Sequence, residues 1–277
     1  MRSAGVWLSL ALVMGCGGDD DDDDSAAGVC GTEEALPGTV LEDVGKIASI
    51  AFQEREDNGT PMARVANASF FDFTDFDADA PPTVAFEPDF VCSAVVGIQV
   101  VRVEPTVQQT PDGATITVGS ETLDLAEVAP GSMQVDDLPE IAAGTVVSVS
   151  VVGSDGDDQF PSFGAEAAAS DAPSDLTAEV LPSGEIALHW APTGAEAVEV
   201  ELWVTNPEPD FHPVRCVVVD DGCLTVPSRA AEHLFLGVVP IPLNIRVSSV
   251  QSAQWDGPDG EVGFFKIERR RDIAYTP

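Results

Sequence analysis

The feature that most constrains this chain is a two-residue alternation of apolar and polar side chains along much of its length. It is clearest in TITVGSETLDL (115–125), TVVSVSVVG (145–153), EIALHW (185–190) and VEVELWV (198–204). Successive side chains of a β-strand point to opposite faces, so this alternation is typical of strands with one buried face. Turn-forming residues separate the segments about every ten residues, which favours antiparallel sandwiches. The sequence therefore predicts an all-β protein of two consecutive antiparallel β-sandwich domains.

The chain divides into four predicted ranges. Residues 1–15 form a signal peptide, and residues 16–29 form a modified cysteine followed by an acidic tether. Residues 30–170 form the first sandwich, and residues 171–277 form the second. The boundary between the sandwiches falls in AEAAASDAPSD (165–175), whose small, polar and proline-containing composition is typical of a connector.

The second range contains two strands whose buried faces can be assigned. In EIALHW, Ile186, Leu188 and Trp190 share one face, which leaves His189 on the outer face. In the next strand, valines and Leu202 form a matching buried row, and Glu199, Glu201 and Trp203 point the other way.

This second range resembles a fibronectin type III or related immunoglobulin-like domain. The resemblance rests on APSDLTAEVLPSGEIALHWAP (172–192) and on LNIRVSSV (243–250), which is similar to the F strand of that family. Leu243 stands where the family has a tyrosine. The sequence also resembles uncharacterised two-domain bacterial surface lipoproteins in residues 138–163, in IALHWAP (186–192) and in residues 214–234. This resemblance implies location and architecture only.

The first residues predict export and lipid anchoring. Arg2 precedes an apolar run, AGVWLSLALVM (4–14), which is long enough for a signal-peptide core and too short to span a bilayer as a helix. The run ends in Val13-Met14-Gly15-Cys16, which resembles a bacterial lipobox. That resemblance implies acylation of Cys16 and cleavage before it. We therefore expect a protein lipid-anchored to the bacterial cell envelope, at the outer membrane.

The next segment predicts a solvated spacer. It contains six consecutive aspartates, Asp19–Asp24, and no apolar periodicity. Mutual repulsion keeps such a segment extended, and it has no apolar surface with which to offset the entropy of folding. The segment would hold the folded body away from an anionic surface.

Charge restricts the partners. The chain has 12 Lys and Arg against 48 Asp and Glu, a net charge of −36. Nucleic acid is excluded as a partner, because phosphate binding needs clustered cations. Anionic lipid is equally unsuitable, which leaves the acyl anchor as the contact with the membrane. An unknown protein or glycan partner remains.

Four cysteines remain after Cys16, and an even number in an exported chain predicts two disulfides. Chain order favours Cys30–Cys92 and Cys216–Cys223 among three possible pairings. The second bond stays open, because Asp221-Gly222 favours a tight two-residue turn that places Cys216 opposite Pro227.

No familiar catalytic motif occurs in the sequence, which lacks GxSxG, HExxH, a Walker loop, GxGxxG and CxxC. Its three histidines, His189, His212 and His233, are widely separated. The densest acidic cluster, in FDFTDFDADAP (71–81), could supply oxygen ligands to calcium. Its carboxylates are Asp72, Asp75, Asp77 and Asp79.

These features predict a non-enzymatic, lipid-anchored envelope protein with no required cofactor, acting as an interaction or structural module. The alternative is a calcium-dependent adhesion or carbohydrate-binding module. A third hypothesis is a glycan-acting hydrolase with a carboxylate pair distant in sequence.

Overall fold

A computed structural model describes residues 6–8, 39–41, 46–57, 60–72, 92–94, 110–153, 160–204, 213–231, 234, 242–257 and 261–275. Most of the described residues are in β-strands, which confirms the predicted all-β class. The early strands are β1 (Val6–Leu8), β2 (Thr39–Leu41), β3 (Lys46–Asp57), β4 (Thr60–Asp72) and β5 (Cys92–Ala94). The middle strands are β6 (Gly113–Val118), β7 (Glu121–Asp124), β8 (Ala126–Ala129), β9 (Ser132–Asp136), β10 (Val146–Val152) and β11 (Phe163–Ala168). The last elements are β12 (Ser174–Val180), β13 (Ile186–Ala191), β14 (Ala197–Val204), β15 (Val214–Val218), β16 (Cys223–Val226), the helix α1 (Ser228–Ala231), β17 (Leu243–Asp256) and β18 (Glu261–Tyr275).

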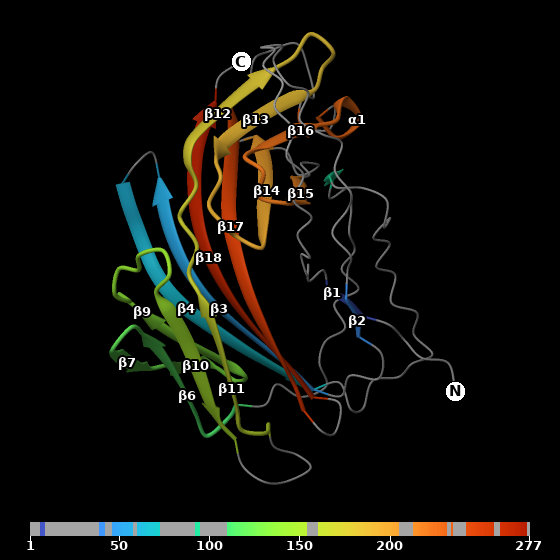
Figure 1. The fold of residues 1–277 in the computed structure, drawn as a ribbon. Coiled ribbons are helices and arrows are strands. Elements are labelled where there is room, and N and C mark those ends of the chain that lie inside the picture. The colour runs from blue at the N-terminus through green and yellow to red at the C-terminus, as the bar shows by residue number, and fades with distance from the viewer. Residues whose placement is uncertain are drawn as a thin grey trace, which may run out of the picture.

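One sheet of nine strands forms the framework of the molecule. Its order is β5-β15-β14-β17-β18-β3-β4-β9-β8, antiparallel except where β18 runs parallel to β3. Two smaller sheets, β11-β10-β6-β7 and β12-β13-β16, accompany it, and β1 pairs with β2 separately. In Figure 1 the long red strands β17 and β18 run beside both the blue β3 and β4 and the orange β14.

The three-stranded sheet and the β15-β14-β17-β18 part of the large sheet enclose one core. Ile186, Leu188 and Trp190 of β13 are buried in it, and His189 between them is exposed, as their spacing predicts. The alternating apolar residues of β14 and β17 face them. Seven strands in two facing sheets form an immunoglobulin-like sandwich.

The four-stranded sheet belongs to a second core, made with the other end of the large sheet. Phe52 of β3, Phe70 of β4 and Phe160 before β11 are all fully buried there. The rings of Phe70 and Phe160 meet edge to face, with centroids 5.2 Å apart. Phe70 therefore lies on the core face of β4, together with Ala66 and Ala68 at two-residue spacing.

The β17–β18 hairpin belongs to both cores. Its pairing is unbroken from Leu243↔Tyr275 to Asp256↔Val262. Phe265 and Ile267 of β18 lie in the core beneath the four-stranded sheet, whereas Ile273 and Tyr275, further along the same strand, pack against the core beneath the three-stranded sheet. The residue ranges 30–170 and 171–277 therefore share one continuous sheet. The predicted division into two consecutive domains did not include this shared sheet.

The connector between the small sheets is part of the packed structure. Residues 165–168 belong to β11 and residues 174–175 begin β12, while Ala169 and Ser170 are buried. Arg269 of β18 donates to the Ser170 carbonyl at 2.9 Å, and Ser249 of β17 donates to that of Asp171 at 2.8 Å. Because its residues are small, this connector can lie close to the large sheet. A segment with the composition of a linker therefore crosses the large sheet as part of the packed structure.

The tight hairpin predicted between Cys216 and Cys223 does not form. β15 pairs with β14 and β5 in the large sheet, whereas β16 pairs with β13 in the small one. The Asp220 carboxylate directs this crossing by accepting hydrogen bonds from the Trp190 indole at 3.0 Å and from the backbone N–H of Thr193 at 2.6 Å. Tertiary hydrogen bonds thus override the local turn preference of Asp221-Gly222.

The predicted Cys30–Cys92 and Cys216–Cys223 pairing is wrong. Cys92 is bonded to Cys216, with their Cα atoms 4.1 Å apart at directly paired positions of β5 and β15. Cys223 is also disulfide-bonded, and its partner lies outside the described residues. The sheet order brings Cys92 to Cys216 across 124 residues of sequence, so proximity along the chain was a misleading guide.

Within the described residues, no helix is both long and apolar enough to cross a membrane. The predicted signal peptide contributes β1, and cleavage before Cys16 would remove that strand from its partner β2.

Candidate functional site

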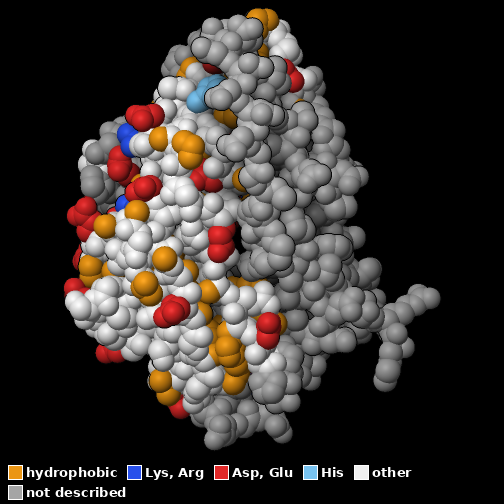
Figure 2. Space-filling model, viewed as in Figure 1, with side chains coloured by type: hydrophobic (Ala, Val, Ile, Leu, Met, Phe, Trp, Pro, Cys, Tyr) orange, Lys and Arg blue, Asp and Glu red, His pale blue; other side chains and the backbone are white. Residues whose placement is uncertain are grey.

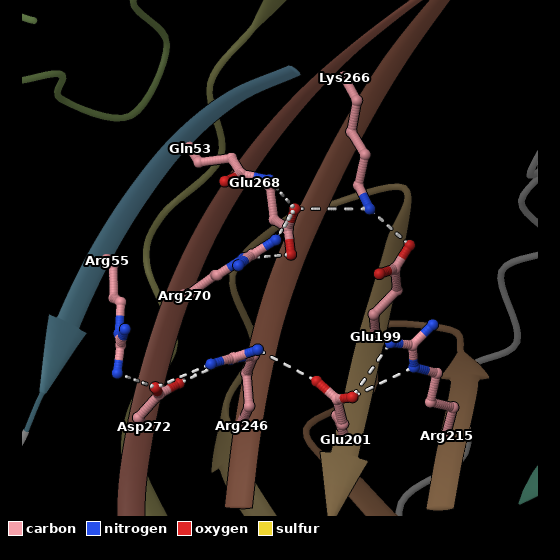
Figure 3. A network of polar contacts seen from close by, with 10 residues as sticks. All are labelled: Gln53, Arg55, Glu199, Glu201, Arg215, Arg246, Lys266, Glu268, Arg270 and Asp272. Atoms are coloured by element: carbon pink, nitrogen blue, oxygen red, sulfur yellow. Dashed lines mark hydrogen bonds and ion pairs between the residues drawn. The ribbon is translucent and has the colours of Figure 1, made fainter. Parts of the chain in front are cut away.

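The outer face of the large sheet carries a connected network of charged side chains, which we call the ionic face (Figure 3). Its members come from β3, β14, β15, β17 and β18. Along each strand these residues alternate with residues of the buried face. The two-residue alternation of a strand therefore places the charged side chains together on the opposite face of the sheet. The members are Gln53, Arg55, Glu199, Glu201, Arg215, Arg246, Lys266, Glu268, Arg270 and Asp272.

One row of the network crosses four adjacent strands. The register aligns Arg215 with Glu201, Glu201 with Arg246, and Arg246 with Asp272. Arg246 donates through Nε and Nη2 to the two oxygens of Asp272, at 2.9 and 3.2 Å, and through Nη1 to Glu201 at 3.1 Å. Arg215 reaches the same Glu201 at 3.1 Å, and Arg55 reaches Asp272 at 3.0 Å. Opposite charges therefore alternate across the sheet.

A second group converges on Glu268. Arg270 donates to its two oxygens at 2.6 and 2.8 Å, and Lys266 Nζ lies 3.7 Å from Oε2. Lys266 also contacts Glu199 Oε1 at 2.7 Å, which links β18 to β14 above the intervening β17. Only 5% of the Glu268 side chain is exposed, so this carboxylate is held by paired cations rather than by water.

Two groups of the network have shifted pKa values. Burial by itself raises the pKa of Glu268, but the hydrogen bonds from Arg270 and the positive charge of Lys266 outweigh it, and the net pKa is lowered from 4.5. The hydrogen bonds to Asp272 raise the pKa of Arg246, against the effect of its own burial. Both groups are therefore held in their charged forms.

A hollow of about 440 Å³ lies in the ionic face. Ser248, which is buried, sits between Arg246 and Val250 along β17 and pairs with Glu199 and Arg270 on the adjacent strands. A short side chain surrounded by long charged ones leaves a depression with polar walls. The other lining residues are Val200, Glu201, Arg215, Cys216, Val217, Lys266 and Glu268.

Arg246, which lines the hollow, covers one face of an aromatic ring. Trp203 lies on the same side of β14 as Glu201, and the Arg246 guanidinium carbon is 5.1 Å from the centroid of its ring. Stacking against a sugar would need that ring face to be open. Trp203 therefore supports the position of Arg246.

The distribution of cations sets this sheet apart from the rest of an acidic chain. On the face seen in Figure 2, acidic side chains are common and basic ones are few. Nine of the chain's 12 Lys and Arg residues lie in the large sheet: Lys46, Arg55, Arg64, Arg215, Arg246, Lys266, Arg269, Arg270 and Arg271.

The structure does not test most of the predicted site residues. Cys16, Cys30, Asp75, Asp77 and Asp79 lie outside the described residues. Asp72 ends β4. In the part of the chain that is described, no three His, Cys, Asp or Glu side chains are grouped to hold a metal ion.

Sequence reasoning missed the ionic face as a site. It placed Glu199, Glu201 and Trp203 on the outward side of their strand, which the structure confirms. The partners of these residues lie in LNIRVSSV and in FKIERRRD (265–272), and alternate positions in both segments are charged or polar. That alternation was the available signal. The missing information was the strand order that aligns the three segments.

The fold defines an all-β protein built of β-sandwich units. No protein-family model matches the chain, and no curated protein matches it. Among solved structures, it is similar to the FN1–FN3 domains of chicken CNTN1, with 12% identity and a TM-score of 0.25 over 86% of this chain and 67% of that one. A two-domain fibronectin type III segment of chicken tenascin is 11% identical, with a TM-score of 0.27 over 78% of this chain and 93% of the other. A chain of a cytokine receptor complex is 12% identical, with a TM-score of 0.25 over 73% and 90%. Superpositions this loose carry no argument about activity.

Proposed function

We propose that this chain is a non-enzymatic binding protein of the bacterial envelope, anchored by a lipid on Cys16, and that it binds its partner at the hollow in the ionic face. The observation that carries the binding role is the hollow itself. It is a polar depression of about 440 Å³ on a rigid sheet, a volume within the range of small-ligand sites.

The rigidity of the surroundings supports recognition rather than simple solubility. The hollow lies on four consecutive strands of the large sheet, and the buried carboxylates Glu268 and Asp272 fix the guanidinium groups around it. A site on regular strands keeps its geometry better than one on loops.

The binding role can be tested in living cells with a photo-crosslinking amino acid at Val217, which lines the hollow. We expect a crosslinked product in the full-length, envelope-located chain, and loss of that product when Arg215→Gln is added. Val128, exposed on the edge strand β8, is the matched control position. Equal products at both positions, or a product at Val217 that Arg215→Gln leaves unchanged, would contradict the assignment.

The anchor is supported by the apolar run, Gly15 and the acidic tether, and it has a separate test. The chain is expressed in a diderm host that is fed labelled fatty acid. We expect label in the wild type and none in Cys16→Ser. The Cys16→Ser variant should also be lost from the membrane fraction, because acyl chains would be the main attachment to the bilayer. Equal labelling of both proteins would exclude lipidation at Cys16.

A further inference from the structure

The exposed pairs around the hollow differ from the buried ones in how readily a ligand can open them. Glu268 and Asp272 have only 5% and 9% of their side chains exposed, whereas Arg215 is 65% exposed and Glu199 is 42% exposed. Removing one partner from a buried ion pair is strongly destabilising, whereas an exposed pair contributes little to stability. A ligand can therefore replace contacts of Arg215 and Glu199 while the buried pairs stay intact.

The two exposed groups carry opposite charges at a defined spacing. Glu201 pairs with Arg215, and Glu199 with Val217, so Glu199 and Arg215 are diagonal neighbours across β14 and β15. Diagonal neighbours on one face have backbone positions about 7–8 Å apart. Two residues of extended peptide span about 7 Å, which is comparable to the separation of the two backbone positions from which these side chains extend.

The charge balance of the hollow selects the ligand class. Arg215, Arg246, Lys266 and Arg270 line it together with Glu199, Glu201 and Glu268, and Asp272 beside it is shared between Arg246 and Arg55. The hollow therefore presents charges of both signs, with an excess of one cation. A simple anion is repelled by the −36 net charge of the chain, whereas a molecule with no net charge is not.

From these observations we propose that the hollow binds a zwitterion of dipeptide length, whose carboxylate pairs with Arg215 and whose ammonium group pairs with Glu199. This inference rests on the proposed binding function and specifies its ligand. Ser248 pairs with Glu199 on the side away from β15, so it lies beside the end of the site that would hold the ammonium group.

The test uses the full-length chain, purified in detergent, and isothermal titration with three probes. The probes are alanylalanine, its N-acetyl derivative, which lacks the ammonium group, and its C-terminal amide, which lacks the carboxylate. We expect each blocked derivative to bind more weakly than alanylalanine by up to about fivefold, because each loses one ion pair to a solvent-accessible side chain.

Two variants assign the ends of the ligand. Arg215→Gln should abolish the preference for alanylalanine over the amide, and Glu199→Gln should abolish the preference over the acetylated form. Glu121→Gln, on the exposed strand β7, should keep both preferences. Equal affinity for all three probes, or no binding of alanylalanine at millimolar concentration, would overturn the zwitterion assignment. If the Val217 crosslink still depends on Arg215 in that case, the binding function stands and only the ligand class is wrong.

Discussion

At the scale of single residues, Glu268 is the group on which the ionic face depends most. It is the buried partner of both Arg270 and Lys266, and Gln53 Nε2 lies 3.4 Å from it. Its lowered pKa shows that these contacts outweigh the cost of burying the charge. Removing the charge leaves two cations facing a neutral side chain in a poorly hydrated place.

We therefore expect Glu268→Gln to lower the free energy of unfolding by about 3 kcal/mol at neutral pH. The pKa of Glu268 is lower in the folded than in the unfolded chain, so its contribution is present above about pH 4.5 and is lost as the pH falls through the folded value. Urea unfolding of both proteins between pH 7 and pH 3 measures this. The exposed control Glu121→Gln should change stability by less than about 0.5 kcal/mol. A difference between Glu268→Gln and wild type that stays constant over the whole pH range would contradict this role.

The Phe163 ring occupies the space that a side chain at Gly263 would need. A Cβ atom there would lie 2.8 Å from the Phe163 ring, which stacks on Trp255 with centroids 5.1 Å apart. Phe163 belongs to β11 and Trp255 to β17, so this contact joins the four-stranded sheet to the large one.

Gly263→Ala should destabilise the protein by about 1–3 kcal/mol, because added volume in a packed site forces side chains away from their preferred positions. Gly113→Ala is the matched control, since a Cβ atom at Gly113 meets no atom within 4 Å. Thermal unfolding followed by near-ultraviolet circular dichroism reports both stability and the Trp255 environment. Equal melting temperatures for the two variants would show that the Phe163 ring moves aside without cost.

At the scale of elements, the disulfide fixes the short strand β5 at the edge of the large sheet. β5 has three residues, and all three pair with β15. So few backbone hydrogen bonds hold a strand weakly, and the Cys92–Cys216 bond supplies a covalent link at the last paired position. A covered edge also protects β15 from pairing with another chain.

Peptide mapping without reduction should recover Cys92 linked to Cys216. It should also recover Cys223 linked to Cys30, because the predicted acylation of Cys16 leaves Cys30 as the remaining thiol. The double variant Cys92→Ser, Cys216→Ser should lose about 2–5 kcal/mol of stability. Recovery of Cys30 linked to Cys92 would contradict the pairing in the structure.

At the scale of the whole molecule, the continuous sheet makes the two sandwiches depend on each other. β18 pairs with β3 over 12 positions, from Glu261↔Lys46 to Asp272↔Asp57. Arg269 of β18 contacts Glu54 of β3 at 2.7 Å and the Ser170 carbonyl of the connector at 2.9 Å. Backbone hydrogen bonds, core packing and ion pairs therefore all cross between residues 30–170 and 171–277.

We expect the isolated fragment 171–277 to fold poorly, since it would lose the partner of Cys216 and expose Phe265 and Ile267 of β18. The full-length chain should unfold in one cooperative transition, with coincident curves for different probes. Amide NMR spectra of the fragment and thermal unfolding of the full chain test this. A fragment with dispersed amide signals and an unfolding temperature equal to that of the whole chain would show that the sandwiches are independent.

The sequence by itself determined several of the strands, such as those at 185–190 and 198–204, and which of their faces are buried. Ile186, Leu188 and Trp190 are buried, His189 is exposed, and Glu199 and Glu201 point away from the core, because side-chain direction in a strand depends only on the local two-residue period. Tertiary structure decided which strands became neighbours. Strand order and register depend on contacts between distant segments, which no local pattern encodes. For that reason the Cys92–Cys216 bond, the crossing between β15 and β16, the shared β17–β18 hairpin and the hollow beside Ser248 could be recognised only in the assembled sheet.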